Sequence, residues 1–245
     1  MRVPNPFRVT PSMACLAATF LASSFMPALT SGSGLGAQIV LVDRGTFSVS
    51  VGGEVIGSEE FTIRRAGNRR SATFMANGVV TLTRGGESQE LRPILSAQGA
   101  DGTAGGYELK VVGQDASEIA IRVVDSRFVS NFRSAAGLEE REFRVSTNTR
   151  IVEQFVAHHY YFLRNLREGE TARVIEPRSR TEMDVVAGPS TDEQLRLGGT
   201  LVDSRRVAFR SGEHERIVWF GSQGQVLRVE VPSLGYVAER QDLVG

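Results

Sequence analysis

The fold class is decided by residues 45–63, which read GTFSVSVGGEVIGSEEFTI. The apolar residues from Phe47 to Val51 alternate with polar ones, and the apolar pattern resumes after Gly52-Gly53. Alternation with a period of two is typical of a strand that buries one face, and a Gly-Gly pair supplies the positive φ angles of a tight turn. The stretch therefore predicts a β-hairpin.

The same alternation recurs along most of the chain. Glycine-rich turn clusters separate the apolar runs at intervals of roughly ten to fifteen residues, which is too short for helices between successive strands. This spacing predicts a mainly β fold: a curved antiparallel sheet or half-barrel, or a sandwich, of about 10–14 strands. The apolar runs lie at residues 79–82, 91–95, 107–111, 119–123, 143–145, 172–175, 183–186, 195–197, 207–209, 217–220 and 226–231.

One segment departs from the period of two. Val152, Phe155 and Leu163 fall at helical spacing, and Gly169 stands where the C-terminal cap of a helix belongs. We expect one amphipathic α-helix over about residues 150–167.

Residues 1–37 have the composition of a signal peptide. Arginine supplies positive charge near the start, and the segment Met13–Leu29 is apolar and rich in small residues. A membrane-spanning helix needs about 20 continuous apolar residues, more than this segment offers. We expect cleavage near Ala37 and a single exported β-rich domain over residues 38–245, with no transmembrane segment in the mature chain. We expect the mature chain in the periplasm or outside the cell, two locations that use the same export signal.

The composition excludes several kinds of function. Cys15 is the only cysteine and lies in the predicted signal peptide, so we expect a mature chain without disulfides, cysteine nucleophiles or thiolate metal ligands. Lysine plus arginine and aspartate plus glutamate both number 28, which gives a formal net charge of +0. Nucleic-acid-binding domains usually carry a basic excess, so we expect no nucleic-acid partner.

Two groups of polar residues invite a catalytic or metal-binding interpretation. His158 and His159 are adjacent, which sets them about 100° apart on a helix, whereas chelating pairs favour an i,i+4 spacing. Glu140 and Glu142 point to one face of a strand, and paired carboxylates act in glycoside hydrolysis. Their alternation with arginine nevertheless favours an ordinary solvated strand face. We therefore expect no catalytic residue, no metal ligand and no cofactor.

The strongest site candidate is apolar. The predicted helix carries Phe155, Tyr160 and Phe162, more aromatic surface than one buried stripe needs, and Trp219 lies in the most apolar strand. A helix against the concave side of a curved sheet leaves a lipid-sized cavity between the two. We interpret these four residues as ligand contacts. The alternative interpretation is that they are ordinary core residues.

The opening hairpin, the aromatic segment Tyr160–Leu163 and the ending Val218–Pro232 resemble exported bacterial β-rich domains of unknown function. The ending reads VWFGSQGQVLRVEVP, an aromatic strand, a glycine turn and a strand that stops at proline. More loosely, these domains are similar to the half-barrels of periplasmic lipoprotein carriers, in which a curved antiparallel sheet surrounds a helix and an apolar cavity. The resemblance implies a fold and carries no catalytic residues.

These observations predict a non-enzymatic cell-envelope protein that binds a lipid or another apolar ligand, or that docks an envelope protein. One alternative is a purely structural or protein-docking β domain, which would have a filled interior and a long open sheet edge. The other is an envelope hydrolase that uses Glu140 and Glu142, which would place these carboxylates in a cleft.

Overall fold

The computed structural model describes residues 39–68, 71–144 and 146–243. The predicted signal peptide, residues 1–37, and its cleavage point near Ala37 lie outside these residues. Within the described ranges, no helix has the length and apolar character that crossing a membrane requires.

The described residues form one fifteen-stranded sheet and two short 3₁₀ segments. The mainly β, antiparallel fold predicted from the period of two is confirmed, and the strand number exceeds the expected range by one. The elements are β1 (Val40–Val51), β2 (Glu54–Ala66), β3 (Thr73–Arg84), β4 (Glu87–Gln98), β5 (Thr103–Gly113), β6 (Ser117–Val124), β7 (Arg127–Ser134), β8 (Gly137–Arg144), β9 (Thr149–Ile151), η1 (Ala157–Leu163), β10 (Thr171–Glu176), β11 (Thr181–Leu197), β12 (Thr200–Ser211), β13 (His214–Phe220), β14 (Val226–Val231), η2 (Pro232–Leu234) and β15 (Tyr236–Arg240).

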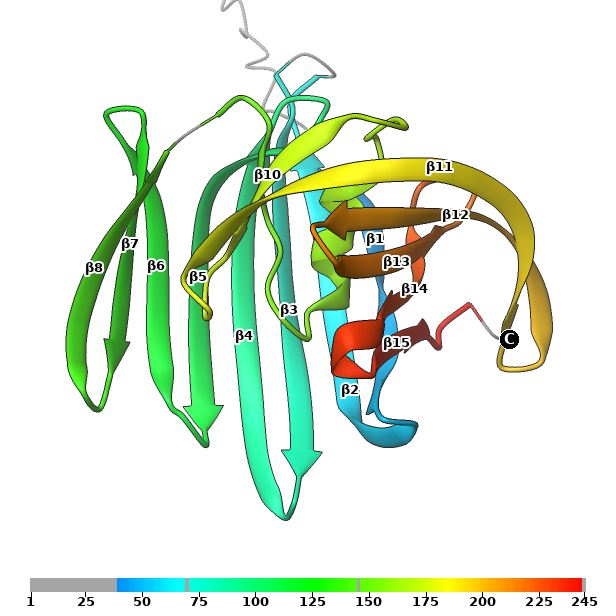
Figure 1. The fold of residues 1–245 in the computed structure, drawn as a ribbon, viewed down its shortest axis with the longest axis horizontal. Coiled ribbons are helices and arrows are strands. Elements are labelled where there is room, and N and C mark those ends of the chain that lie inside the picture. The colour runs from blue at the N-terminus through cyan, green and yellow to red at the C-terminus, as the bar shows by residue number, and fades with distance from the viewer. Residues whose placement is uncertain (1–38, 69–70, 145, 244–245) are drawn as a thin grey trace, which may run out of the picture. The chain divides into compact units, whose positions relative to one another are not determined.

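Strands that follow one another in the sequence are neighbours in the sheet, with one exception. The order runs from β8 down to β1, continues with β15 and then descends to β9. Pairing is antiparallel throughout, apart from the parallel pair β9 and β10. The first and last strands, β1 and β15, therefore pair in the middle of the sheet (Figure 1). Strands β8 and β9, which are consecutive in the chain, form its two edges.

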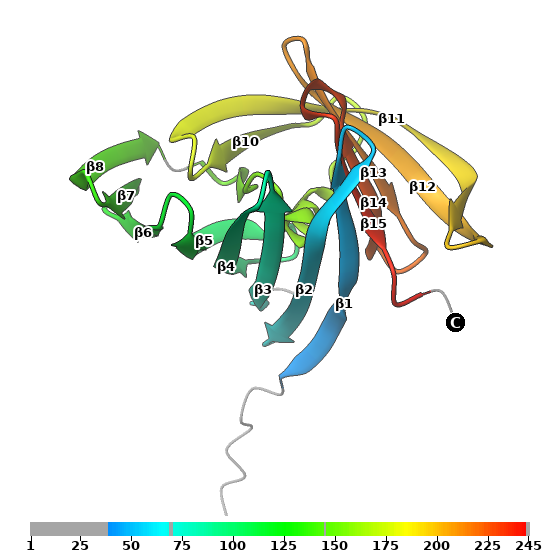
Figure 2. The same cartoon turned by 90° about the horizontal axis from the view of Figure 1, so that it is seen from below.

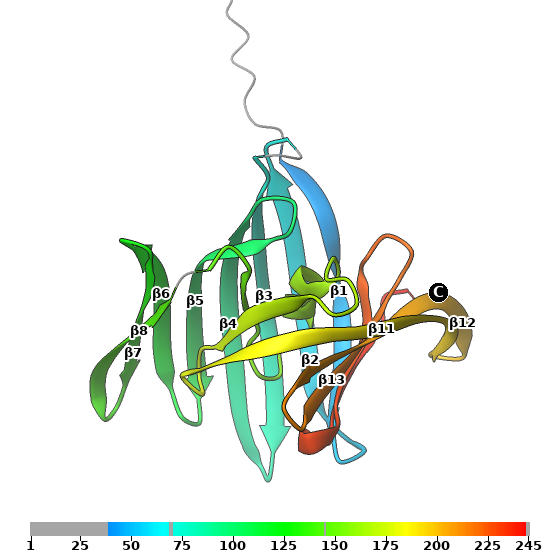
Figure 3. The same cartoon turned by 45° about the horizontal axis from the view of Figure 1, so that its top comes forward.

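The sheet curls so that its two halves face each other with η1 between them (Figure 2). Strands β1–β5 make one wall, and β11 arches across these strands on the other side of η1 (Figure 3). Large antiparallel sheets coil in this way because each strand is twisted relative to its neighbour. The predicted curved half-barrel is thus confirmed.

The first hairpin forms as the sequence predicts. Val51 pairs with Glu54, and the turn between them is made by Gly52 and Gly53, whose φ angles are 60° and 85°. Two successive positive φ values are the requirement of a type I′ turn, which glycine meets without strain.

The predicted α-helix over residues 150–167 is shorter in the structure and of another type. Its beginning is strand β9, and only Ala157–Leu163 is helical, as the 3₁₀ segment η1. All residues of η1 are buried, so the segment has no solvated face. The apolar spacing came from a buried connection between two strands, and such connections are often short 3₁₀ turns.

Around β11, β13 and β14, apolar side chains pack on both faces of the sheet. The main core fills the inside of the curl. A second cluster lies at β11, β13 and β14. The 17-residue strand β11 has a bulge between Ala187 and Ser190 and continues to Leu197, so its last residues contribute to this cluster. The members of this second cluster are Leu195, Leu197, Ile217, Trp219 and Leu227.

Candidate functional site

A buried carboxylate on β2 fixes the start of η1. Glu59 shares the inward face of Phe61 and Ile63, and its side chain is fully buried. It accepts hydrogen bonds from the backbone N–H groups of Ala157 and His158, at 2.6 and 3.0 Å, and it contacts His158 Nδ1 at 2.5 Å. These bonds satisfy N–H groups that the first turn of a helical segment leaves without internal partners.

The His158 ring occupies a space that a glycine leaves open. Phe61 stacks on the ring with a centroid distance of 5.3 Å. Gly78 on β3 pairs with Phe61, and a Cβ atom at this position would stand 3.0 Å from His158 Cε1 and 2.9 Å from the Glu60 backbone oxygen. Glycine in a strand interior often marks such a close approach.

A second buried carboxylate lies next to the other histidine. Glu153 accepts hydrogen bonds from Arg178 Nε at 2.8 Å, from the Arg178 N–H at 3.2 Å and from the Gln154 N–H at 2.8 Å. Its own N–H donates to His159 Nδ1 at 3.2 Å. Burial raises the pKa of Glu153, and Arg178 opposes this rise. Burial lowers the pKa of His159 well below its usual range, and His158 adds to this effect, so His159 is a neutral ring whose Nδ1 accepts.

A pocket of about 230 Å³ opens beside this polar network, and we call it the Phe155 pocket. Its walls come from the turn before η1, from η1 itself, from β10, β11 and β13, and from the chain around η2. Apolar and aromatic side chains make up about half of the lining, and several charged groups complete it. The lining residues are Val152, Glu153, Gln154, Phe155, Tyr160, Glu176, Met183, His214, Arg216, Val231, Ser233, Leu234 and Tyr236.

The backbone at Phe155 is in an unfavourable conformation. Its φ angle is 66°, in the left-handed region that residues other than glycine seldom adopt. The ring packs edge-on against Tyr236 at 5.4 Å, and the Arg178 guanidinium lies 6.0 Å from the ring centroid. Strained backbone of this kind persists where the surroundings hold it, and it is enriched at binding sites.

The polar wall of the pocket is an ion pair flanked by two tyrosines. Arg216 Nη2 contacts Glu176 Oε1, and both side chains are largely buried. Burial raises the pKa of Tyr160 to about 12, although Arg216 opposes the rise. Burial also raises the pKa of Tyr236 well above its usual value, and the charge of Glu59 adds to it. Among the residues described, neither Arg216 Nη1 nor the Tyr236 hydroxyl has a hydrogen-bond partner.

The structure separates the four predicted ligand contacts. Phe155 and Tyr160 line the Phe155 pocket. Phe162 lies in the main core and packs edge-on against Phe74 at 6.1 Å. Trp219 belongs to the second cluster, and its indole Nε1 donates to Glu193 at 2.6 Å. Ligand binding by any of them stays a prediction.

Sequence reasoning missed Glu176, Arg216 and Tyr236. Glu176 and Arg216 could have been found as charged residues on the inward face of a strand. Glu176 ends the run ARVIE, and Arg216 lies on the same face of its strand as the buried Val218. Burying a charged side chain costs free energy unless the charge is paired, so one acidic and one basic residue on inward faces indicate an ion pair inside the fold. Tyr236 follows a glycine turn and gave no comparable signal.

The carboxylates weighed for hydrolysis do not lie in a cleft. Glu140 and Glu142 are exposed on the edge strand β8, and Glu142 pairs with Arg127 on β7. This placement contradicts the hydrolase alternative that was built on these two residues. Within the described ranges, no group of three or more His, Cys, Asp or Glu residues is arranged to hold a metal ion.

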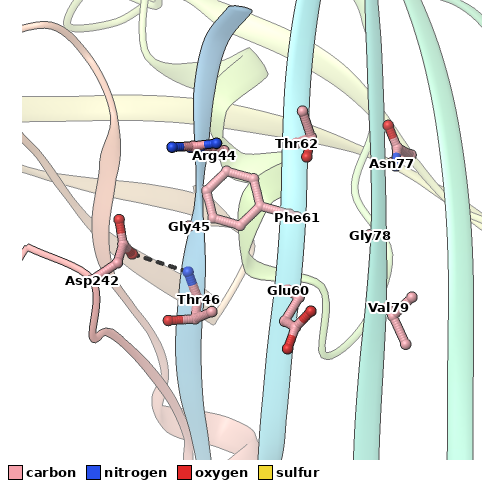
Figure 4. Close-up of a pocket in the computed structure, with 10 residues that line it drawn as sticks. All are labelled: Arg44, Gly45, Thr46, Glu60, Phe61, Thr62, Asn77, Gly78, Val79 and Asp242. Atoms are coloured by element: carbon pink, nitrogen blue, oxygen red, sulfur yellow. Dashed lines mark hydrogen bonds between the residues drawn. The ribbon is translucent and has the colours of Figure 1, made fainter.

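A larger depression of about 550 Å³ crosses β1, β2 and β3 (Figure 4). Its lining includes Arg44, Glu60 and Val79, which are exposed, and Asp242 closes one side by accepting a hydrogen bond from the Thr46 N–H at 2.9 Å. The depression is shallow and open to solvent. It lacks the enclosure that lets buried polar groups select a ligand, so we favour the Phe155 pocket as the candidate site.

Two of the solved structures that resemble this chain are described here in turn. No family model and no curated protein matches the chain. A β-barrel-like protein of domain of unknown function DUF1849 from Brucella abortus is similar over 81% of this chain and 94% of its own, with 8% identity and a TM-score of 0.49. A DUF1089 family protein from Pseudomonas aeruginosa is similar over 72% of this chain and 90% of its own, with 15% identity and a TM-score of 0.39.

Proposed function

We propose that this chain is a non-enzymatic binding protein of the cell envelope and that it holds a small, mainly apolar ligand in the Phe155 pocket. The observation that carries the proposal is the pocket itself, where aromatic side chains from η1 and β15 meet beside a strained residue. Enclosed, largely apolar cavities with a few convergent polar groups are the usual form of small-molecule sites.

The polar groups around the pocket support binding better than catalysis. A general acid or base needs a free proton-transfer position that a substrate can reach. The carboxylates of Glu153 and Glu176 are each engaged by an arginine, Arg178 and Arg216 respectively. The Glu59–His158 pair is fully buried and holds the start of η1.

The size of the pocket limits what it can hold. Pockets for drug-sized ligands usually measure about 300–1,000 Å³, and this one is smaller. It therefore accommodates a compact molecule, or one end of a longer molecule whose remainder lies at the rim formed by Ser233 and Leu234.

The cellular location of the protein is part of the same proposal. The composition of residues 1–37 supports export, and the balance of 28 basic against 28 acidic residues supports a function without nucleic acid. We propose that the ligand is met in the periplasm or outside the cell.

Native mass spectrometry with lipid extraction tests the proposal on protein purified from a bacterial envelope. We expect a co-purifying apolar molecule, and we expect the variant Phe155→Ala to lose most of it. Phe132→Ala is the matched control, because Phe132 is also a half-buried phenylalanine beneath an arginine, Arg180, at 5.2 Å, yet it lies outside the pocket. Protein of the bare sequence mass that also fails to bind an apolar fluorescent dye would contradict the proposal and favour a docking domain.

A further inference from the structure

We propose that the ligand of the Phe155 pocket is an amphiphile and that its uncharged, hydroxyl-bearing head group lies in a second hollow on the other side of Arg178. This inference rests on the proposed function and adds the chemical class of the ligand. It also gives a longer ligand an exit past Gln154 instead of the rim at Ser233 and Leu234. Two sets of observations carry it: the position of the second hollow and the polar groups in its lining.

The second hollow has a volume of about 290 Å³, and we call it the polar pocket. Strands β4, β5, β6 and β7 each contribute one lining residue, and the turn between β10 and β11 contributes Arg178 and Ser179. Six of its eight lining residues are polar or charged, whereas about half of the Phe155 pocket is apolar. The two pockets therefore offer different surroundings to the two ends of an amphiphile.

Three observations place the two pockets next to each other. Gln154 lines both of them and is exposed. The Arg178 guanidinium, which lines the polar pocket, lies 6.0 Å from the centroid of the Phe155 ring. Ser179 of the polar pocket donates from Oγ to Glu176 Oε2 of the Phe155 pocket at 3.3 Å. A chain that leaves the Phe155 pocket over the exposed Gln154 therefore arrives in the polar pocket.

The Arg178 side chain stands between the two pockets and is held there by the rest of the chain. Its Nε donates to Glu153 Oε1 at 2.8 Å, in a pair whose carboxylate is buried. Its Nη1 donates to Gln89 Oε1 at 3.3 Å, and its Nη2 donates to the Gln154 carbonyl oxygen at 2.8 Å. All three nitrogens are engaged and the charge is paired, so Arg178 offers an anionic head group little attraction.

Three polar side chains of the polar pocket are left for a ligand. Among the residues that the structure describes, the side chains of Asp115, Ser117 and Gln154 have no hydrogen-bond or ion-pair partner. Asp115 and Gln154 are exposed, and 8% of the surface of Ser117 is accessible. A carboxylate only accepts hydrogen bonds, whereas an amide and a hydroxyl both donate and accept them. Hydroxyl groups on a ligand match all three, because they also donate and accept.

The charges around the polar pocket disfavour an ionised head group. A carboxylate or phosphate would lie near the unpaired Asp115. The arginines of the adjacent turn, Arg178 and Arg180, do not offset this repulsion, because each is paired with a glutamate of the chain. An ammonium group would lose part of its hydration for a carboxylate that is exposed and screened by solvent. An uncharged, hydroxylated head group has neither cost.

Four ligands with the same octyl chain and different head groups test the proposal. Octyl glucoside, methyl octanoate, octanoate and octylamine compete with an apolar fluorescent dye bound to the purified protein, at neutral pH and below the concentrations at which they form micelles. We expect octyl glucoside to displace the dye at a concentration about tenfold lower than the other three, which corresponds to about one or two additional hydrogen bonds. Equal displacement by all four, or tighter binding of any of the other three, would overturn this inference and leave the proposed function intact.

A matched pair of variants links the selectivity to the polar pocket. Asp115 and Asp125 are both exposed and have left-handed backbones with φ angles of 54° and 45°, a conformation that asparagine adopts as readily. Asp115→Asn should weaken octyl glucoside about threefold to fivefold and leave methyl octanoate unchanged. Asp125→Asn, which lies outside both pockets, should change neither. An unchanged affinity for octyl glucoside in Asp115→Asn would overturn the inference.

The variant Phe155→Ala tests the other end of the ligand. It should weaken all four octyl compounds, because each places its chain in the Phe155 pocket. Phe132 lines the polar pocket, but its ring lies beneath Arg180 at 5.2 Å, so Phe132→Ala should leave these affinities unchanged. If Phe155→Ala weakened none of the four compounds, or if neither the dye nor any compound bound, the inference and the proposed function would both be wrong.

Discussion

Glu59 and His158 are 99 residues apart in the sequence, and in the structure Glu59 Oε1 lies 2.5 Å from His158 Nδ1 inside the sheet. This contact joins the second strand to the buried segment η1. Because Glu59 also accepts two backbone N–H groups of η1, it sets where the segment begins and hence where Tyr160 lines the Phe155 pocket.

The first prediction concerns this carboxylate. Glu59→Gln removes the charge and one acceptor oxygen from a fully buried group, and we expect it to lower the free energy of unfolding by about 2–4 kcal/mol. Chemical denaturation followed by circular dichroism measures the change. Glu60→Gln is the control, since Glu60 is the exposed neighbour on the same strand. A loss for Glu59→Gln no larger than for Glu60→Gln would show that the contact is dispensable.

Substitutions at two glycines should destabilise the protein for different reasons. Gly78→Ala puts a Cβ atom against His158 and the Glu60 backbone oxygen, and we expect a loss of about 1–3 kcal/mol from overpacking. A Cβ atom at Gly53 would meet no described heavy atom within 4 Å, but the φ angle of 85° disfavours a β-branched side chain, so we expect Gly53→Val to cost about 1–2 kcal/mol.

Thermal unfolding of the two glycine variants separates these causes. His158→Ala should relieve the part of the clash of Gly78→Ala that involves the His158 ring, although not the part that involves the Glu60 backbone oxygen, and should leave the effect of Gly53→Val unchanged. Additive losses in the double variant of residues 78 and 158 would contradict the close approach.

Trp219 tests the second apolar cluster. The side chain is buried against Leu195, Leu197 and Leu227, and its indole donates to Glu193. Trp219→Ala should therefore cost about 3–5 kcal/mol, whereas Trp219→Phe, which keeps most of the volume, should cost less than half of that. Urea unfolding followed by circular dichroism gives both values. A loss under about 1 kcal/mol for Trp219→Ala would show that the end of β11 does not cover this strand.

The stability of the protein should fall below neutral pH because of His159. Burial lowers the pKa of this ring in the folded state, so the unfolded chain takes up a proton at a pH where the folded chain does not. Stability then decreases as the pH falls through the usual histidine pKa of about 6.5. Glu153 works in the opposite sense, since its raised pKa favours the folded state as the pH falls further.

The variant His159→Gln keeps an acceptor for the Glu153 N–H but cannot be protonated. We expect its stability to depend less on pH between about pH 7 and pH 5 than that of the unmodified protein. His214→Gln, which changes an exposed histidine at the pocket rim, should leave the dependence as it is. Equal pH dependence in all three proteins would assign the effect to other groups.

The sheet could be predicted from the sequence, and the site could be predicted only in part. A period of two indicates which residues share a face of a strand: it grouped Phe47 with Val49 and Phe61 with Ile63, and all four are buried in the structure. It could not reveal that β1 pairs with β15, because that pairing joins distant segments whose patterns are alike. Strand β9 has three residues, too few for any period to appear.

The segment η1 shows why the remaining parts of the site could not be predicted from the sequence. The spacing of Val152, Phe155 and Leu163 reads as an amphipathic stripe only if the other positions face water. In the structure the whole of η1 is buried, and Phe155 has a left-handed backbone that interrupts any regular helix. Burial on every side depends on the curl of the sheet, which is a property of the whole fold. Phe155 and Tyr160 were found because aromatic residues gather there, whereas Arg216 and Tyr236 come from strands that only the curl brings near.

The pairing of β1 with β15 also imposes an order on how the chain acquires its structure. Arg240 on β15 binds the carboxylate of Asp43 on β1 at 2.8 and 3.0 Å, across 197 residues. The strands between them can assemble as successive hairpins, but the seam at the centre of the sheet must wait until its last strand has been made. Contacts between such distant residues slow folding, since a long loop must close before they form. We therefore expect the seam between β1 and β15 to be completed late, and until then β1 exposes an open edge to any other extended chain.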